Sequence, residues 1–471
     1  MNELSIRLNT DGNSYLYEQI YEYIRDEIKE GKLLTGERLP STRFLAEYLQ
    51  VSRSTVELSY EQLLSEGYIE SKPYKGYFVC KVDELYDFKA IPKIVQESKP
   101  GPTEYLYDFT PNGIELNGFP LSTWKKISRN VMTEAGNDMF ELGDSKGDAD
   151  LRETISRYLH ASRGVNCQAE QVIIGAGNDY LFMLLEKIIG CNYTIGMEHY
   201  TYKRAYRIFN ACGFKMASIE MDDSGISVID LEEKKADIAY VMPAHQYPIG
   251  VVMPIGRRME LLRWASREEN RYLIEDDYDS EFRYKGKPIP SLQASDQGDN
   301  VIYMGTFSKS IAPAIRISYM VLPEKLVLQY ENKCTFLSCT VSRIDQGILN
   351  EFIRDGYYER HLNRMRKIYR AKHDYLLKLL EEFELTFKVS GENAGVHVLL
   401  KAQNGMSEAQ LIESAKAHNV KVYGISDSSI RYDSDKIPED EYSNPVVLLG
   451  YCGMNEKEIK EGIKQLKKAW L

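Results

Sequence analysis

The run Leu273-Ile274-Glu275-Asp276-Asp277-Tyr278-Asp279 is followed, about 30 residues later, by Gly305-Thr306-Phe307-Ser308-Lys309-Ser310. The first run is apolar and ends in carboxylates, which predicts a buried strand with acidic residues at its end. The second follows another apolar run, residues 301–304, and passes through small residues to a single lysine. Ligands of parallel sheets sit at the carboxyl ends of the strands, so both runs are candidates for one site.

Similar β-branched runs recur on both sides of this stretch, at residues 172–174, 238–242, 272–274, 301–304 and 317–322. They alternate with helical patterns from about residue 108 to the end of the chain. Strands that alternate with helices predict a mostly parallel α/β sheet.

Composition and charge limit the remaining choices. The chain has 471 residues with 43% hydrophobic and 27% charged residues, which is typical of a globular protein of two or three domains. The net charge of −11 gives no overall attraction to nucleic acid or membranes. Seven scattered cysteines without a C-x-x-C pair predict reduced thiols and no metal site. We find no membrane segment or signal peptide and expect a cytoplasmic protein.

The first 80 residues predict three helices and a β-hairpin, which together form an α+β winged helix-turn-helix. Apolar residues recur every four positions from Leu16 to Ile28, and Ser41 is a good cap for a second helix. A third helix is expected to begin at residues 52–55, and the spacing of Ser54 and Glu57 predicts a capping box at its start. Two short strand-like runs then surround a turn at residues 72–76.

Three domains follow from these patterns: residues 1–81 for DNA binding, a proline-containing linker at 82–107, and an effector domain at 108–471. Residues 1–80 hold nine basic and thirteen acidic residues, so a protein-interaction module is an open alternative. The edge proposed to contact DNA is nevertheless basic, with Arg38, Arg43, Arg53, Lys72 and Lys75. Residues at the amino end of the second motif helix read bases or phosphates.

Residues 36–79 resemble the winged helix of GntR-type transcription regulators. The family pattern LPS-x-R-x-LA, VSR-x-T and Y-x-x-L-x-x-EG-x-I is nearly continuous here. The resemblance implies that double-stranded operator DNA is bound by Arg43, Arg53, Ser54, Thr55, Lys75 and Gly76.

Residue chemistry alone points to pyridoxal 5′-phosphate in the second domain. Lys309 offers an amine for a Schiff base, and Asp276 a carboxylate that keeps a pyridine nitrogen protonated. Hydroxyls and Arg316 offer a phosphate clamp. Taken alone, Lys309 is more typical of a solvated loop lysine and Asp276 of a helix cap at the end of a strand. The cofactor site is indicated by the spacing of the two residues together.

Residues 108–471 resemble a fold-type I, aspartate aminotransferase-like domain, and the whole chain resembles the MocR subfamily, closest to the γ-aminobutyrate-responsive type. The resemblance rests on residues 244–248, 274–282 and 302–310. It implies that Lys309 is the internal-aldimine lysine and Asp276 the partner of the pyridine nitrogen. Tyr278 would bind the ring hydroxyl, Tyr202 would stack on the ring, and Thr306 and Arg316 would hold the phosphate.

The chain departs from this pattern in two places. Asn178 and Asp179 replace Ser/Thr-Gln after the glycine turn at residues 175–177, so they are expected to bind phosphate through their backbone, before a helix from Tyr180. Arg204 matches an effector-binding arginine. The second such arginine aligns near Asp427, and Arg431 is a candidate substitute. For both arginines, an ion pair within the protein is an equal alternative to effector binding. For His245 and Gln246, a structural hydrogen bond is an equal alternative to a role in the site.

The strand expected at residues 446–451 lacks the arginine that holds the substrate carboxylate in aminotransferases. We therefore interpret the chain as a regulator that senses an amine, an amino acid or pyridoxal 5′-phosphate by aldimine chemistry at Lys309. An active aminotransferase with an accessory DNA-binding domain and a regulator independent of the cofactor are the alternatives. The resemblance also implies a homodimer with exchanged domains, which the linker is long enough to allow.

Overall fold

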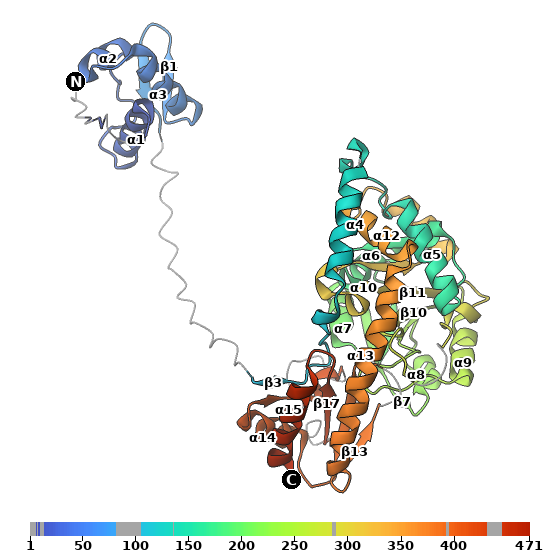
Figure 1. Cartoon of the computed structure of the whole chain (residues 1–471). Helices are drawn as coiled ribbons and strands as arrows, with labels where there is room; N and C mark the ends of the chain where they lie inside the picture. Colours follow the sequence, from blue (N-terminus) through green and yellow to red (C-terminus); the bar gives the residue numbers. More distant parts are fainter. Residues whose placement is uncertain are drawn as a thin grey trace. The chain divides into compact units, whose positions relative to one another are not determined.

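The computed structural model of the chain describes residues 6, 8–9, 14–81, 105–134, 136–284, 289–391, 395–430 and 445–471 (Figure 1). The chain divides into two compact units, Met1–Thr103 and Glu104–Leu471. No helix in these described ranges has the length and apolarity needed to cross a membrane.

The first unit is built from three helices and one hairpin, as the sequence predicts. Ile20, Ile24 and Ile28 of the first helix are buried against Val56 and Tyr60 of the third in one hydrophobic cluster. Ser41 caps the second helix by accepting a hydrogen bond from the backbone N–H of Phe44. The helices and strands are α1 (Leu16–Lys29), α2 (Thr42–Leu49), α3 (Arg53–Ser65), β1 (Ile69–Lys72) and β2 (Gly76–Val79).

The predicted capping box of α3 is wrong. Ser52, two residues before Ser54, has the extended backbone of a cap, and its hydroxyl accepts a hydrogen bond from the N–H of Thr55 at 3.2 Å. Glu57 instead pairs with Arg53, one helical turn away, at 2.8 Å. A serine caps a helix only where its own backbone is extended. Ser54 already lies within α3, so its S-x-x-E spacing with Glu57 is a coincidence.

The second unit is organised around a seven-stranded sheet in the order β4-β12-β11-β10-β9-β5-β6. β12 is antiparallel to both of its neighbours, and the other pairs are parallel, so the mostly parallel sheet is confirmed. The strands are β4 (Val172–Gly175), β5 (Thr194–Glu198), β6 (Lys215–Ile219), β9 (Ile238–Val241), β10 (Tyr272–Asp277), β11 (Val301–Thr306) and β12 (Ser318–Val321).

Helices cover both faces of this sheet, which explains why its strands are continuously apolar. Successive residues of one strand enter different clusters: Ile173 packs with Leu181 of α6, and Ile174 packs in the cluster of Leu151 of α5. The helices are α4 (Leu121–Glu134), α5 (Ala149–Arg163), α6 (Asn178–Ile189), α7 (Lys203–Ala211), α8 (Val228–Glu233), α9 (Ile255–Ala265), α10 (Phe307–Ser310), α11 (Glu324–Lys333) and α12 (Arg343–Arg354).

The long helix α13 (Tyr357–Leu380) leads from this layer to the C-terminal part of the unit (Figure 1). There a four-stranded antiparallel sheet has the order β13-β14-β17-β16. Tyr107, the last residue of the predicted linker, pairs with Val420 in this part of the unit. The remaining elements are β3 (Tyr107–Asp108), β7 (Met221–Asp222), β8 (Gly225–Ile226), β13 (Phe387–Ser390), β14 (His397–Ala402), β15 (Val420–Lys421), β16 (Tyr423–Gly424), β17 (Val446–Gly450), α14 (Glu408–Ala417) and α15 (Glu456–Trp470).

The topology brings several chemically active residues to one edge of the large sheet. β10 ends at Asp277 and β11 at Thr306, and the two strands are parallel neighbours. β4, which ends at Gly175, has the same direction because it is antiparallel to β12. The carboxyl ends of these strands therefore form the floor on which the site is built.

Candidate functional site

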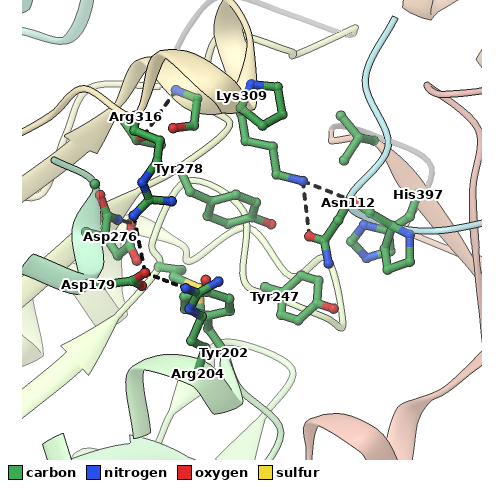
Figure 2. Close-up of a pocket in the computed structure, with 18 residues that line it drawn as sticks. Asn112, Asp179, Tyr202, Arg204, Tyr247, Asp276, Tyr278, Lys309, Arg316 and His397 are labelled. Carbon is green, nitrogen blue, oxygen red and sulfur yellow. Dashed lines mark hydrogen bonds and ion pairs between the residues drawn. The ribbon is translucent and has the colours of Figure 1, made fainter. Parts of the chain in front are cut away.

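A cavity of about 200 Å³ lies at this edge of the sheet (Figure 2). Every cofactor- and effector-binding residue predicted from the sequence lines it, apart from Arg431, which lies outside the described residues. The predicted residues in its wall are Asn178, Asp179, Tyr202, Arg204, Asp276, Tyr278, Thr306, Lys309 and Arg316. The structure thus brings together residues that span nearly 140 positions of the sequence.

Lys309 extends from the short helix α10 into the cavity (Figure 2). Its Nζ donates hydrogen bonds to the backbone carbonyl of Pro111 at 3.3 Å and to Oδ1 of Asn112 at 3.2 Å. Burial lowers the pKa of this amine, and the carboxylate of Asp279 opposes the shift. A lowered pKa increases the fraction of neutral amine, which is the nucleophilic form.

Asp276 lies next to the end of β10 and is only 3% exposed. Its carboxylate accepts hydrogen bonds from the hydroxyl of Tyr240 and, at 3.5 Å, from Nδ2 of Asn178. Burial raises the pKa of Asp276 to about 7. Its described partners carry no positive charge, so a protonated ring nitrogen would be a fitting counter-charge.

Tyr278 and His245 form a small buried network with Asp279. His245 Nδ1 lies 2.9 Å from Oδ2 of Asp279 and 3.0 Å from the hydroxyl of Tyr278. If Nδ1 carries the proton and donates it to Asp279, the hydroxyl of Tyr278 is left to donate elsewhere. Burial raises the pKa of Tyr278 well above its ordinary value, so the phenol keeps this proton.

The opposite wall has the donors that a phosphate needs. Gly177 adopts a φ of +90° at the cap of α6, and an added Cβ would lie 2.7 Å from Nη2 of Arg316. The residues at the start of α6 line the cavity together with Thr306, Ser308 and Arg316. A helix N-terminus with hydroxyls and an arginine is a suitable anion site.

The lysine, the buried carboxylate and the anion cradle fit pyridoxal 5′-phosphate in chemistry and in mutual placement. Each part matches one functional group of that molecule: the aldehyde, the ring nitrogen and the phosphate.

The helix expected from Tyr180 begins two residues earlier, at Asn178. Both side chains that we had limited to backbone roles therefore lie on the first helical turn and line the cavity. Asn178 approaches Asp276, and Asp179 contacts two arginines. Contact of the phosphate with the backbone N–H groups of Asn178 and Asp179 stays a prediction.

Arg204 of α7 is held by Asp179, with Nη2 at 2.5 Å from Oδ2, and the same oxygen lies 3.4 Å from Nη2 of Arg316 (Figure 2). This ion pair is the alternative that the sequence left open for Arg204. Asp427 lies in the 3₁₀ turn Ile425–Ser428. The effector role of Arg204 and Arg431 stays a prediction.

His245 and Gln246 take part in structural hydrogen bonds, one of the two alternatives left open by the sequence. Nε2 of Gln246 donates to Oε2 of Glu198 at 2.7 Å and to the carbonyl of Tyr200 at 2.6 Å. Oε1 of Gln246 accepts from the N–H of Ile249. These contacts fix the loop that presents Tyr247 to the cavity.

Several residues in the wall were missed by sequence reasoning. Asn112 and Pro111 lie more than 190 positions before Lys309, in a Thr-Pro-Asn-Gly stretch that reads only as a turn. His397 enters from β14 of the other sheet, and Tyr240 contacts Asp276 from the neighbouring strand. Ser308 could have been predicted from the sequence, since it lies between Thr306 and Lys309.

The first unit displays the predicted DNA-contacting residues on its surface. The side chain of Arg43 is 81% exposed and that of Arg53 is 67% exposed; each is paired only with a glutamate one turn along its own helix. Ser54 and Thr55 both lie within 2.8 Å of the Ser52 hydroxyl at the start of α3. At the turn of the hairpin, Lys75 precedes Gly76, which has a φ of +101°.

Comparison with known proteins gives two domain matches. Residues 16–79 match the bacterial regulatory proteins of the gntR family. Residues 114–432 match the aminotransferase class I and II family.

Two relatives are similar to this chain over nearly their whole length. The chain is 41% identical over 459 residues to the uncharacterized HTH-type transcriptional regulator YdeL of Bacillus subtilis, covering 97% of this chain and 96% of that protein. It is 30% identical over 480 residues to the probable rhizopine catabolism regulatory protein MocR of Rhizobium meliloti, covering 98% and 95%. Kynurenine aminotransferase of Pyrococcus horikoshii is similar in structure, with a TM-score of 0.67 and 26% identity over 78% of this chain and 91% of that chain.

Proposed function

The chain belongs to the MocR-like HTH-type transcriptional regulators, which join a GntR DNA-binding domain to an aminotransferase-like domain for pyridoxal 5′-phosphate, and on this premise we propose how it senses a ligand. A small amine, an amino acid or pyridoxal 5′-phosphate itself is the effector, and it acts at Lys309. Its binding alters how the winged helices of a homodimer hold operator DNA in the cytoplasm. Each N-terminal domain packs on the partner's second domain, as in the family that the chain resembles.

The observation that carries this proposal is the convergence of Lys309, Asp276 and Arg316 on one cavity. The lysine supplies a primary amine whose pKa is lowered by burial, and the carboxylate lies where it can hold a proton on a ring nitrogen. The cradle at the start of α6 would fix the phosphate. When bound, pyridoxal 5′-phosphate supplies an aldehyde that condenses with amines and a ring that withdraws electrons.

The chain's own residues divide the work in this cavity. Asn112 orients the amine of Lys309, since its Oδ1 accepts a hydrogen bond from Nζ at 3.2 Å. Tyr240 and Asn178 position the carboxylate of Asp276. Tyr278 keeps a hydroxyl proton to donate to a ring oxygen, and Tyr202 offers an aromatic face beside it.

A second feature supports a sensor over an enzyme. β17 (Val446–Gly450) is apolar and buried along its whole length. It therefore offers no arginine for the carboxylate of an amino acid, and bidentate arginine contacts are what orient such substrates. Transamination requires the bound amine to be held in the reactive geometry. A site that binds an amine without orienting it therefore favours binding of the ligand over its chemical conversion.

The test uses the full-length protein loaded with pyridoxal 5′-phosphate. We expect a visible absorbance band that is lost in Lys309→Ala and kept in Lys187→Ala, which removes an exposed lysine of α6. Addition of an effector amine should change both this band and the affinity for DNA upstream of the gene. An unchanged band in Lys309→Ala would contradict the role of Lys309, and sustained transamination would contradict the sensor.

A further inference from the structure

The charges around Arg204 point to the class of effector. Asp179 lies between Arg204 and Arg316, and one of its carboxylate oxygens contacts both guanidinium groups (Figure 2). The contact to Arg204 is the shorter, at 2.5 Å against 3.4 Å. Arg204 therefore has a counter-ion that belongs to the chain itself.

Occupation of the phosphate cradle would strengthen this pairing. The following argument rests on the proposed function. A phosphate bound to Arg316 would bring negative charge close to Asp179 and would compete with Asp179 for the guanidinium of Arg316. The carboxylate of Asp179 would then pair with Arg204 alone. The pair is then electrically neutral. The side chain of Arg204 is 60% exposed, so its pair with Asp179 is a surface ion pair. A carboxylate on the effector would have to replace Asp179 in this pair, and the exchange of one such pair for another returns little net free energy.

Asp427 and Lys203, two residues of opposite charge, lie outside the described lining of the cavity. Burial raises the pKa of Tyr247, and the negative charge of Asp427 adds to the shift, so this carboxylate acts on a residue of the cavity wall. Burial also raises the pKa of Asp427, and the charge of Lys203 opposes that shift. Asp427 thus acts on Tyr247 of the cavity wall, and Lys203 acts on Asp427 as an opposite charge.

His397 offers a hydrogen-bond acceptor in place of a cation. Its Nε2 donates to the carbonyl of Pro248 at 2.7 Å, and its buried Nδ1 has no partner among the described residues. Burial lowers the pKa of His397 to about 4, so the ring is neutral at physiological pH. The free nitrogen can accept a hydrogen bond from a donor but cannot pair with a carboxylate.

We propose that the effector is a primary amine without a carboxylate, such as an amino alcohol, and that Asp179 excludes acidic amines by neutralising Arg204. Asp179 is then a specificity-determining residue. The amine end of the effector meets Lys309, and its other end carries hydrogen-bond donors and no negative charge.

The test compares two amines of equal length, 4-amino-1-butanol and γ-aminobutyrate, which differ in a hydroxymethyl group against a carboxylate. Their dissociation constants are measured by calorimetry on the full-length protein loaded with pyridoxal 5′-phosphate. We expect the alcohol to bind roughly tenfold more tightly, and Asp179→Asn to shift the ratio toward the acid by about tenfold or more, the size of one charge-assisted hydrogen bond. Asp223→Asn, at an exposed position outside the cavity, should leave the ratio unchanged.

Arg204 provides the second half of the test. In the double variant Asp179→Asn, Arg204→Gln the gain for γ-aminobutyrate should disappear, because no free guanidinium remains. Tighter binding of the acid by the unmodified protein, or an unchanged ratio in Asp179→Asn, would overturn this inference alone. If that acid preference is lost in Arg431→Gln, the carboxylate binds at Arg431 instead. Failure of both amines to bind would overturn the proposed amine sensing and this inference with it.

Discussion

At the scale of single residues, the site combines groups that are unfavourable by themselves. Asp276 is a buried carboxyl whose described hydrogen-bond donors, Tyr240 and Asn178, are neutral. Lys309 is an amine that burial makes easier to deprotonate. Charged groups taken from water without an opposite charge cost free energy, and they persist where a function requires them. A cofactor that offers a cationic ring nitrogen would remove this cost at Asp276.

This cost predicts how pH affects the cofactor-free protein. The pKa of Asp276 is about 7 in the folded chain against 3.8 for an unperturbed aspartate. The folded state therefore holds its proton across this window while the unfolded state releases it, so stability falls as the pH rises from about 4 to about 7. Asp276→Asn has no charge to bury. We expect it to raise the free energy of unfolding at pH 8 by on the order of 3–4 kcal/mol, and by less at pH 5.

Urea denaturation at the two pH values measures this difference, with Asp150→Asn, at an exposed position of α5, as the control. The same variant should bind pyridoxal 5′-phosphate more weakly, because the partner of its ring nitrogen is neutral. A gain in stability that is equal at pH 5 and pH 8 would show that the carboxyl of Asp276 does not titrate in this range.

At the scale of elements, the N-terminus of α3 is the part of the first unit best prepared for DNA. Ser52 caps the helix, and Arg53, Ser54 and Thr55 follow in its first turn. Arg53 is paired with Glu57, but both side chains are accessible to solvent. An exposed pair of this kind is worth about 0–1 kcal/mol, so a phosphate or a base edge can replace the glutamate at little cost.

Replacement of this arginine should weaken operator binding. For Arg53→Ala we expect a loss of about 1–3 kcal/mol with relaxed sequence preference if the guanidinium contacts a base. If it contacts a phosphate, the loss will be similar for all sequences and the salt dependence will decrease. Fluorescence anisotropy with labelled operator DNA at two salt concentrations separates these outcomes.

Lys32→Ala is the matched control, since it removes one positive charge from the end of the unit where α1 terminates. It should bind operator DNA as the unmodified protein does. Equal affinity of Arg53→Ala and the unmodified protein would contradict the assignment of α3 as the recognition helix.

At the scale of the whole molecule, the chain consists of two units with separate cores. The hydrophobic cluster of the first unit contains residues between Ile6 and Val79, and the clusters of the second contain residues from Tyr107 onward. The candidate cavity lies entirely in the second unit. A ligand that binds there stabilises that unit directly, by mass action.

Calorimetry of the full chain should therefore show two transitions. Pyridoxal 5′-phosphate at about 100 times its dissociation constant should stabilise the larger transition by about 2.7 kcal/mol, which raises its midpoint by a few degrees. In Lys309→Ala this shift should shrink. A shift of the larger transition that is equal in Lys309→Ala and in the unmodified protein would contradict binding of the cofactor at this cavity.

The sequence by itself determined the elements and the identity of the reactive groups. Periodic apolar residues fix α1, continuous apolar runs fix the strands of the large sheet, and the spacing of Asp276, Lys309 and Arg316 indicates one site. These features are encoded locally or follow from the common direction of parallel strands. The helix α6 begins two residues before the predicted start, because Gly177 and Asn178 are as typical of a turn as of the start of a helix.

Only the tertiary structure decided which side chains face each other. Asn112, Tyr240 and His397 come from separate segments, and nothing in their neighbouring sequence indicates a contact with the site. The same holds for the pairing of Asp179 with Arg204, 25 positions away. Contacts of this kind depend on how helices and strands pack, and packing depends on the whole set of buried surfaces, whereas hydrophobic periodicity is read a few residues at a time.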